Sequence, residues 1–340
     1  MQALLATCSL RAGTGAGRVS ADFGSEQLMQ TTSFKSYALT TLLLLLSACA
    51  SVPPPQPLPP QPLPPQHAPV QNLLGETDDL GLVADQALQL AQRYGKDQVL
   101  VVLDIDNTLL AMEQGLGSDQ WYDWQKELQS QDPCNELLVS DRLAVQGALY
   151  FASAMRLTQP DAAEQVSRLQ GAGLTIIVLT SRGADFRLQT FRELRRNGFS
   201  FWSSALPPKR GYPAPFVPEG GTRPALYEDG VFLTAGQHKG AMLKALLDKT
   251  GIDYPAIVVM ADDKKRNLQA VMETFSGLGT SVHGWRYAGE DGAVATLDHA
   301  GAASQWDSIR PALQEIQQIM GPDNFDFPEY VGPKGCDSLP

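Results

Sequence analysis

Two aspartates one residue apart, Asp104 and Asp106, come directly after the aliphatic run at residues 101–103. Such a run is typical of a fully buried strand in a parallel sheet. Ligands of open α/β sheets bind at the carboxyl ends of the strands, so both carboxylates are expected at a site. Two acids this close resist joint ionisation unless a cation lies between them, and a metal on Asp104 would leave Asp106 free to carry a proton. A solvated turn after the strand explains the pair equally well.

Three later apolar runs also end close to polar side chains, which favours the first alternative. These are residues 174–179 with Thr180 and Arg182, residues 231–234 with Lys239, and residues 256–260 with Asp262, Asp263 and Asn267. Residues 281–287 are a final strand candidate, and helical patterns separate the runs. Alternating strands and helices predict an α/β fold, a Rossmann-like parallel sheet with helices on both faces.

An insertion is predicted between the first two of these strands, at about residues 111–158. It contains a helix that begins near Ser118 or Asp119, which are suitable N-cap residues, and a second helix at about residues 135–155. Trp121 and Trp124 lie on the first helix. They are either core residues of a small helical cap or an aromatic lid over a substrate.

The order Asp-x-Asp, Thr, Lys and Asp-Asp at these strand ends resembles the haloacid dehalogenase superfamily of Mg²⁺-dependent phosphohydrolases. The resemblance covers about residues 99–267. The segments Gly-Ser-Asp-Gln-Trp at 117–121 and Thr-Ala-Gly-Gln-His-Lys-Gly at 234–240 look like those of a group of uncharacterised bacterial members. The resemblance implies that the cap covers the active site and selects the substrate.

The resemblance also implies a role for each polar residue. Asp104 would be the nucleophile that forms an aspartyl-phosphate. Asp106 would protonate the leaving alkoxide and then deprotonate the attacking water. Thr180 would donate a hydrogen bond to the phosphoryl oxygens, and Lys239 would neutralise Asp104 and the phosphate. Members that cut carbon–halogen bonds lack the second aspartate, so Asp106 points to phosphatase or phosphomutase chemistry.

Mg²⁺ is the cofactor that this resemblance implies. It prefers oxygen ligands, which Asp104, the backbone carbonyl of Asp106 and the Asp-Asp pair would supply. The spacing to Asn267 favours Asp263 as the direct ligand, with Asp262 acting through water.

Three further residues are candidates for contacts with a small phosphorylated substrate: Arg182, Asn267 and Trp121. A surface salt bridge is an equal alternative for Arg182.

The first 49 residues are expected to comprise an upstream extension and a lipoprotein signal peptide, which is removed so that the mature protein begins at Cys49. A run of leucines at 42–46, with Lys35 ahead of it, fits the core of a signal peptide. Leu46-Ser47-Ala48-Cys49 resembles the bacterial lipobox, in which the cysteine is lipidated. Translation is expected to start at Met29, which leaves residues 1–28 as an upstream extension.

Lipidation at Cys49 predicts an anchor on the periplasmic side of the bacterial outer membrane, since Ala50 is not the aspartate that suggests retention in the inner membrane. Residues 50–72 are rich in proline and form an extended tether. The hydrolase domain is expected to occupy residues 73–340. In an oxidising periplasm Cys134 and Cys336 are expected to pair, with two free buried thiols as the alternative.

The formal net charge of −11 argues against a nucleic-acid partner, because phosphate backbones require clustered Lys and Arg. The expected function is therefore that of a lipid-anchored, Mg²⁺-dependent phosphomonoesterase. A catalytically silent lipoprotein that binds a phosphorylated ligand or a protein is the alternative from another class, and a phosphotransferase is a third.

Overall fold

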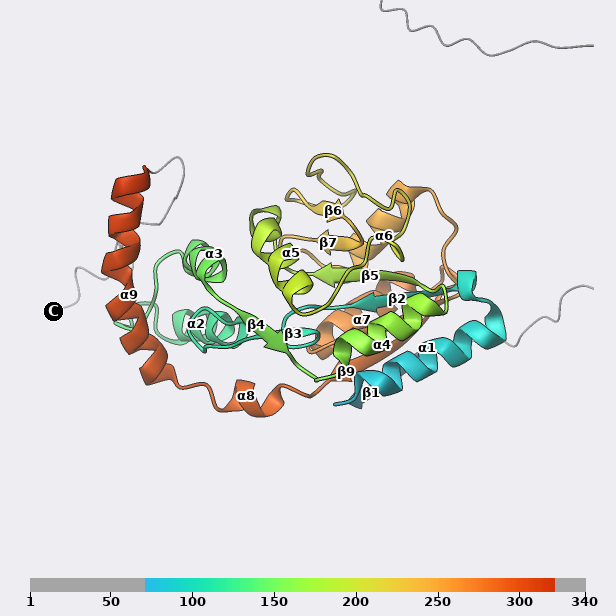
Figure 1. The fold of residues 1–340 in the computed structure, drawn as a ribbon, viewed down its shortest axis with the longest axis horizontal. Helices are drawn as coiled ribbons and strands as arrows, with labels where there is room; N and C mark the ends of the chain where they lie inside the picture. The colour runs from blue at the N-terminus through green and yellow to red at the C-terminus, as the bar shows by residue number, and fades with distance from the viewer. Residues whose placement is uncertain (1–70, 322–340) are drawn as a thin grey trace, which may run out of the picture. The chain divides into compact units, whose positions relative to one another are not determined.

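A computed structural model describes residues 71–321 of the chain. Seven strands form one sheet in the order β1-β9-β8-β2-β5-β7-β6, and every neighbouring pair is parallel except β6 with β7 (Figure 1). The strands are β1 (Leu73–Thr77), β2 (Val99–Leu103), β5 (Thr175–Thr180), β6 (Leu226–Glu228), β7 (Val231–Leu233), β8 (Ile257–Asp262) and β9 (Ser281–Tyr287). The five strands predicted from apolar runs are all present, whereas β1 and β6 were not predicted.

Helices cover both faces of the sheet, as predicted, because the central strands are apolar on both sides. Val101 and Leu103 of β2 point into one hydrophobic cluster and Leu100 and Val102 into another. The first cluster is covered by α1 (Leu80–Tyr94), α4 (Ala162–Gly171) and α5 (Arg187–Arg196). The second is covered by α6 (Lys239–Thr250) and α7 (Lys265–Phe275). The predicted α/β class is confirmed.

The predicted insertion is a hairpin that carries two helices. Its elements are β3 (Leu110–Met112), α2 (Asp119–Gln131), α3 (Arg142–Ala152) and β4 (Met155–Leu157), with β3 and β4 antiparallel. The Ser118 hydroxyl caps α2 by accepting a hydrogen bond from the Trp121 amide at 3.2 Å. Because β1 precedes β2, the insertion follows the second strand of the chain and not the first.

Two helices after β9 were not predicted: α8 (Asp291–Ala295) and α9 (His299–Met320). Trp306 and Leu313 of α9 pack with Trp121 and Leu149 of the insertion in a third hydrophobic cluster. The segments are far apart in sequence yet lie side by side (Figure 1). The cap is therefore built from the insertion and the C-terminal helix together.

Several predictions fall on residues 1–70 and 322–340, which lie outside the described residues. They concern the extension, Met29, Cys49, most of the tether and Cys336. Cys134 is disulfide-bonded, and its pairing with Cys336 stays a prediction. No helix within residues 71–321 combines the length and apolar character needed to cross a bilayer.

Candidate acidic active site

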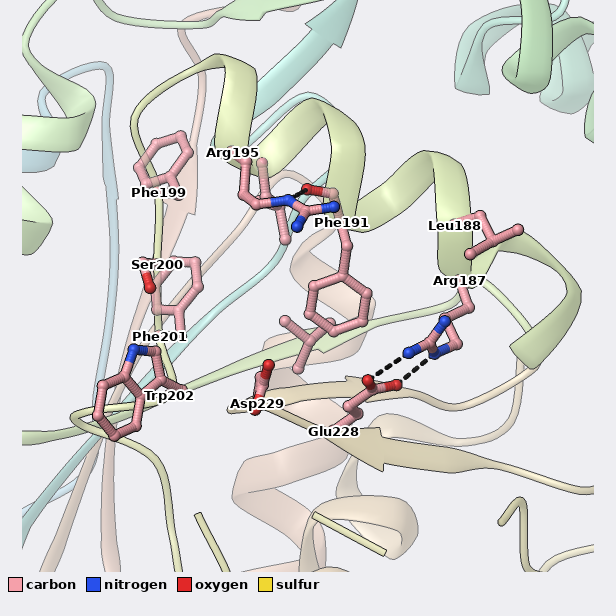
Figure 2. Close-up of a pocket in the computed structure, with 12 residues that line it drawn as sticks. Arg187, Leu188, Phe191, Arg195, Phe199, Ser200, Phe201, Trp202, Glu228 and Asp229 are labelled. Atoms are coloured by element: carbon pink, nitrogen blue, oxygen red, sulfur yellow. Dashed lines mark hydrogen bonds and ion pairs between the residues drawn. The ribbon is translucent and has the colours of Figure 1, made fainter. Parts of the chain in front are cut away.

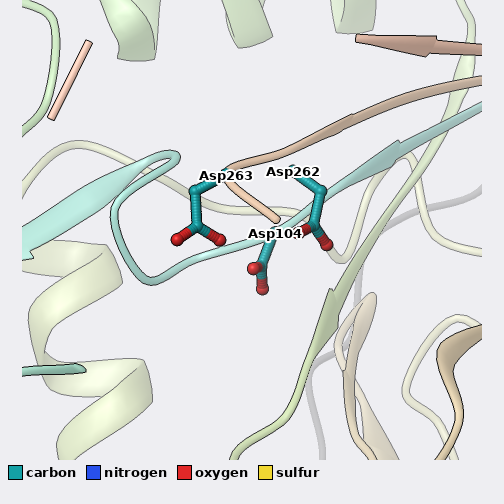
Figure 3. A group of neighbouring side chains, drawn as sticks. All are labelled: Asp104, Asp262 and Asp263. Carbon is teal, nitrogen blue, oxygen red and sulfur yellow. The ribbon is translucent and has the colours of Figure 1, made fainter. Parts of the chain in front are cut away.

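Three aspartates meet at the carboxyl edge of the sheet. Asp104 follows β2, Asp262 ends β8 and Asp263 comes directly after it. The two strands are neighbours, with Leu103 opposite Ala261, so their ends deliver these side chains to one place. One carboxylate oxygen from each aspartate lies within 4.8 Å of the others, and Figure 3 shows the three carboxylates grouped around Asp104. The sequence prediction that these strand ends converge is borne out in the positions of the side chains.

Lys239 places a positive charge inside this cluster. It is the first residue of α6, where His238 acts as the N-cap and accepts a hydrogen bond from the Ala241 amide at 3.2 Å. The Lys239 ammonium lies 2.8 Å from Asp104 and 2.7 Å from Asp262, and its side chain is only 1 % exposed. A buried ammonium between two buried carboxylates offsets the cost of placing them together.

One cation does not balance three carboxylates, and the pKa values of Asp104 and Asp263 reflect this. Burial raises the pKa of Asp104 to about 7 despite the attraction of Lys239. Burial and the charges of Asp104 and Asp262 raise the pKa of Asp263 to about 9. Burial alone would lower the pKa of Lys239, but the two carboxylates hold it above its ordinary value. The cluster therefore favours binding of a further positive charge.

The hydrogen bonds of the Asp-Asp pair separate the roles of its two members. Asp262 accepts hydrogen bonds from Lys239, from the Lys264 amide at 2.9 Å and from Asn267 at 2.8 Å. Within residues 71–321, by contrast, no hydrogen bond reaches the carboxylate of Asp263. Asp263 and Asp104 thus keep oxygens free for a ligand, and a set of carboxylate oxygens fits a hard divalent cation such as Mg²⁺.

Asn267 lies beside the Asp-Asp pair and donates a hydrogen bond to Asp262 at 2.8 Å, while its contact with a substrate stays a prediction.

Thr180 ends β5, next to β2, and is fully buried. Its hydroxyl oxygen accepts a hydrogen bond from the Arg182 amide at 3.2 Å. Its backbone carbonyl accepts one from the Thr234 hydroxyl at 2.8 Å, which ties the end of β5 to the residue after β7. Thr180 is therefore held rigidly at the same edge as Asp104.

Asp106 is held by Arg182 and by the cap. Arg182 donates from Nε to Oδ2 at 3.0 Å and from a terminal nitrogen to Oδ1 at 2.8 Å, and the Tyr150 hydroxyl donates to Oδ1 at 2.8 Å. The Arg182 side chain is 4 % exposed. The salt-bridge alternative for Arg182 is thus the one observed, although Arg182 is buried and Asp106 is only partly exposed.

The same contacts determine the charge of Asp106. Burial would raise its pKa, but the charge of Arg182 and the hydrogen bonds from Arg182 and Tyr150 hold the pKa below its ordinary value. Asp106 is therefore ionised in this arrangement. An ionised carboxylate can accept a proton, whereas the expected donation to a leaving group requires the protonated form.

Lys264 links the acidic cluster to the cap. It follows Asp263 directly, and its ammonium forms ion pairs with Asp119 and Asp123 of α2. Sequence reasoning found neither Lys264 nor Tyr150, because both act through contacts between segments far apart in the chain. The position of Lys264 next to the Asp-Asp pair was the one available signal.

Trp121 is 0 % exposed and packs in the cluster formed with α9. Its indole is enclosed by apolar side chains, so the structure favours the core alternative over a contact with the substrate.

A separate pocket of about 150 Å³ lies between α5 and the β6–β7 edge (Figure 2). Phe191, Phe201 and Trp202 line it together with Arg187 and Glu228. Arg187 and Glu228 form an ion pair with each other. None of the acidic-cluster residues lines this pocket, and its charged pair is already satisfied, so the acidic cluster is the stronger functional candidate.

The fold and the site define an α/β protein with a buried carboxylate triad that can hold a metal ion. The chain matches, over residues 82–318, the model of the family described as "Protein of unknown function (DUF2608)", and it belongs to that family. A search of the curated proteins found no match, and neither did a search of the solved structures.

Proposed function

We propose that this protein is a Mg²⁺-dependent phosphohydrolase of the haloacid dehalogenase type, acting on small phosphomonoesters. The observation that carries the proposal is the grouping of Asp104, Asp262, Asp263 and Lys239 at one edge of a parallel sheet. Phosphoryl transfer depends mainly on positioning and on neutralising charge, and this arrangement supplies both.

The metal would be held by the side chains of Asp104 and Asp263 and by the backbone carbonyl of Asp106. When bound, it would neutralise charge on the phosphoryl oxygens. Asp262 would orient the site through its bonds to Lys239 and Asn267.

Each protein group then has a defined task. An oxygen of Asp104 attacks phosphorus, the bond to the leaving oxygen breaks, and an aspartyl-phosphate forms, while the leaving oxygen takes the bonding electrons and a proton from solvent water. Lys239 and Thr180 stabilise the negative phosphoryl oxygens. Water then attacks phosphorus, the bond to Asp104 breaks, and Asp106 accepts the proton of that water.

The test is Mg²⁺-dependent phosphate release from a panel of phosphomonoesters by the domain that follows the tether. Asp104→Asn should reduce turnover at least 10³-fold, on the order seen when a covalent nucleophile is removed, while the melting temperature stays within a few degrees. Chelation of the metal should stop phosphate release by the unmutated protein, and added Mg²⁺ should restore phosphate release. Wild-type activity in Asp104→Asn would exclude the nucleophile assignment. If the unmutated protein hydrolyses no ester of the panel, the alternative of a catalytically silent binding protein is favoured.

We also propose that lipidation of Cys49 anchors the protein to the periplasmic side of the outer membrane. The support is the sequence Leu46-Ser47-Ala48-Cys49 followed by a proline-rich tether. Labelled palmitate should be incorporated into the unmutated protein and not into Cys49→Ser. A protein that takes up no label would rule out the anchor.

A further inference from the structure

Asp106 makes three hydrogen bonds that together fix both of its oxygens. Oδ1 accepts from Tyr150 and Arg182 at 2.8 Å each, and Oδ2 accepts from Arg182 at 3.0 Å. A bidentate arginine fixes the plane of a carboxylate, and a third donor removes the remaining freedom. The donors come from two segments remote from Asp106 in sequence, the loop after β5 and helix α3 of the cap.

The two donors are themselves held in place. The Arg182 guanidinium lies over the Tyr150 ring, 4.5 Å from its centroid, and donates to the Thr190 hydroxyl at 2.9 Å. Phe186 packs edge-on against the same ring, with centroids 5.6 Å apart. Tyr150 is 3 % exposed. This degree of support is what a group requires if it is to fix the geometry of a catalytic neighbour.

We infer that Tyr150 and Arg182 are positioning residues that hold the Asp106 carboxylate in place for proton transfer, and that the cap thereby completes the active site. The inference rests on the proposed function. It gives the cap a part in the chemistry in addition to any choice of substrate. Neither residue needs to touch the substrate, since each acts through Asp106.

Tyr150→Phe tests this directly, because it keeps the ring and removes only the hydroxyl. We expect kcat to fall about 10- to 100-fold, the cost of misplacing a catalytic group, with KM changed less than threefold. Tyr227→Phe is the matched control: Tyr227 is also fully buried and donates one hydrogen bond, to the Leu206 carbonyl at 3.1 Å. That variant should keep the kcat of the unmutated protein.

Arg182→Lys keeps the charge but loses the bidentate bond, so it should also lower kcat. Its control is Arg156→Lys, because Arg156 also forms a bidentate pair, with Glu290, in which both hydrogen bonds are 2.7 Å long.

A double-mutant cycle separates positioning from a general structural effect. If Tyr150 acts through Asp106, then adding Tyr150→Phe to Asp106→Asn should cause less than a twofold further loss of kcat. If the losses of kcat caused by the two single substitutions multiply in the double variant, the inference is overturned. An unchanged kcat in Tyr150→Phe would overturn it as well.

Crystal structures of the unmutated protein and of Tyr150→Phe give a readout that does not depend on turnover. The inference expects Asp106 to leave its position in the variant, and an unmoved Asp106 would overturn it. An unmutated protein without turnover, together with a displaced Asp106, would reject the proposed function and retain the positioning role.

Discussion

Within residues 71–321, Lys239 is the one side chain that forms ion pairs with both Asp104 and Asp262, at 2.8 and 2.7 Å. Lys239→Met keeps much of the side-chain volume and removes the charge, which leaves two buried carboxylates without their cation. We expect the free energy of unfolding of the metal-free protein to fall by roughly 3–5 kcal/mol, as when one partner of a buried ion pair is removed. Urea unfolding with and without Mg²⁺ measures this, and Mg²⁺ should restore part of the loss by binding the folded state.

Lys244→Met provides the control on the same helix. Lys244 pairs with Asp248 at 2.7 Å, with 39 % of its side chain exposed, and exposed pairs of this kind contribute little to stability. If Lys239→Met destabilises the protein no more than Lys244→Met does, then the acidic cluster does not depend on its cation.

Much of the site was predictable at this scale because strand ends converge. Asp104, Thr180 and Asp262 follow or end adjacent parallel strands, so apolar runs in the sequence were enough to bring them together. Tyr150 and the pairing of Arg182 with Asp106 were not predictable. They depend on how α3 packs beside the loop after β5, which no local pattern in the sequence encodes.

At the scale of elements, the position of Lys239 depends on close packing of α6 against α7. A Cβ at Gly240 would lie 2.2 Å from the Ala270 carbonyl oxygen and 2.3 Å from the Thr274 hydroxyl. Gly240→Ala should therefore force the helices apart and lower the free energy of unfolding by about 1–3 kcal/mol, the usual cost of overpacking. Because Lys239 precedes Gly240, kcat should fall as well. Thermal unfolding and steady-state kinetics measure the two effects.

Gly171→Ala is the comparison, since a Cβ at the end of α4 meets nothing within 4 Å. It should change stability by no more than about 1 kcal/mol. Equal stability of the two variants would show that α6 and α7 can separate at little cost.

The central strands were predictable because each is an uninterrupted buried run. β1 was missed because four of its five residues are only partly buried, at the edge of the sheet. α9 contains Pro311, which obscures a helical pattern. Its contacts with Trp121 arise only in the folded chain, so the sequence predicted a cap made from the insertion alone.

At the scale of the whole molecule, the acidic cluster connects the sheet to the cap. Lys264 follows the Asp-Asp pair and forms ion pairs with Asp119 and Asp123 of α2, while Tyr150 of α3 donates to Asp106. The charge state of the cluster should therefore affect the stability of the entire described domain, including the cap.

The sign of that effect follows from the raised pKa values. The pKa of Asp104 is about 7 and that of Asp263 about 9, against an ordinary value of 3.8. Between the ordinary pKa and the raised pKa of each group, the folded, metal-free protein holds a proton that the unfolded chain has lost. The stabilising contribution of these two groups is therefore fully present below about pH 4, and it is lost as the pH rises toward 9.

Metal binding should reverse this dependence, because the carboxylates must lose their protons to bind Mg²⁺. We expect the melting temperature of the metal-free protein to fall between pH 5 and pH 9, with each kcal/mol worth roughly 2–4 °C in a domain of this size. The stabilisation by saturating Mg²⁺ should grow over the same range.

Asp263→Asn should flatten both trends, whereas Asp253→Asn, which alters an exposed carboxylate, should leave them unchanged. Scanning calorimetry of all three proteins at fixed ionic strength, with and without Mg²⁺, measures these trends. A stabilisation by Mg²⁺ that does not vary with pH, or that persists in Asp263→Asn, would mean that the metal binds away from this cluster.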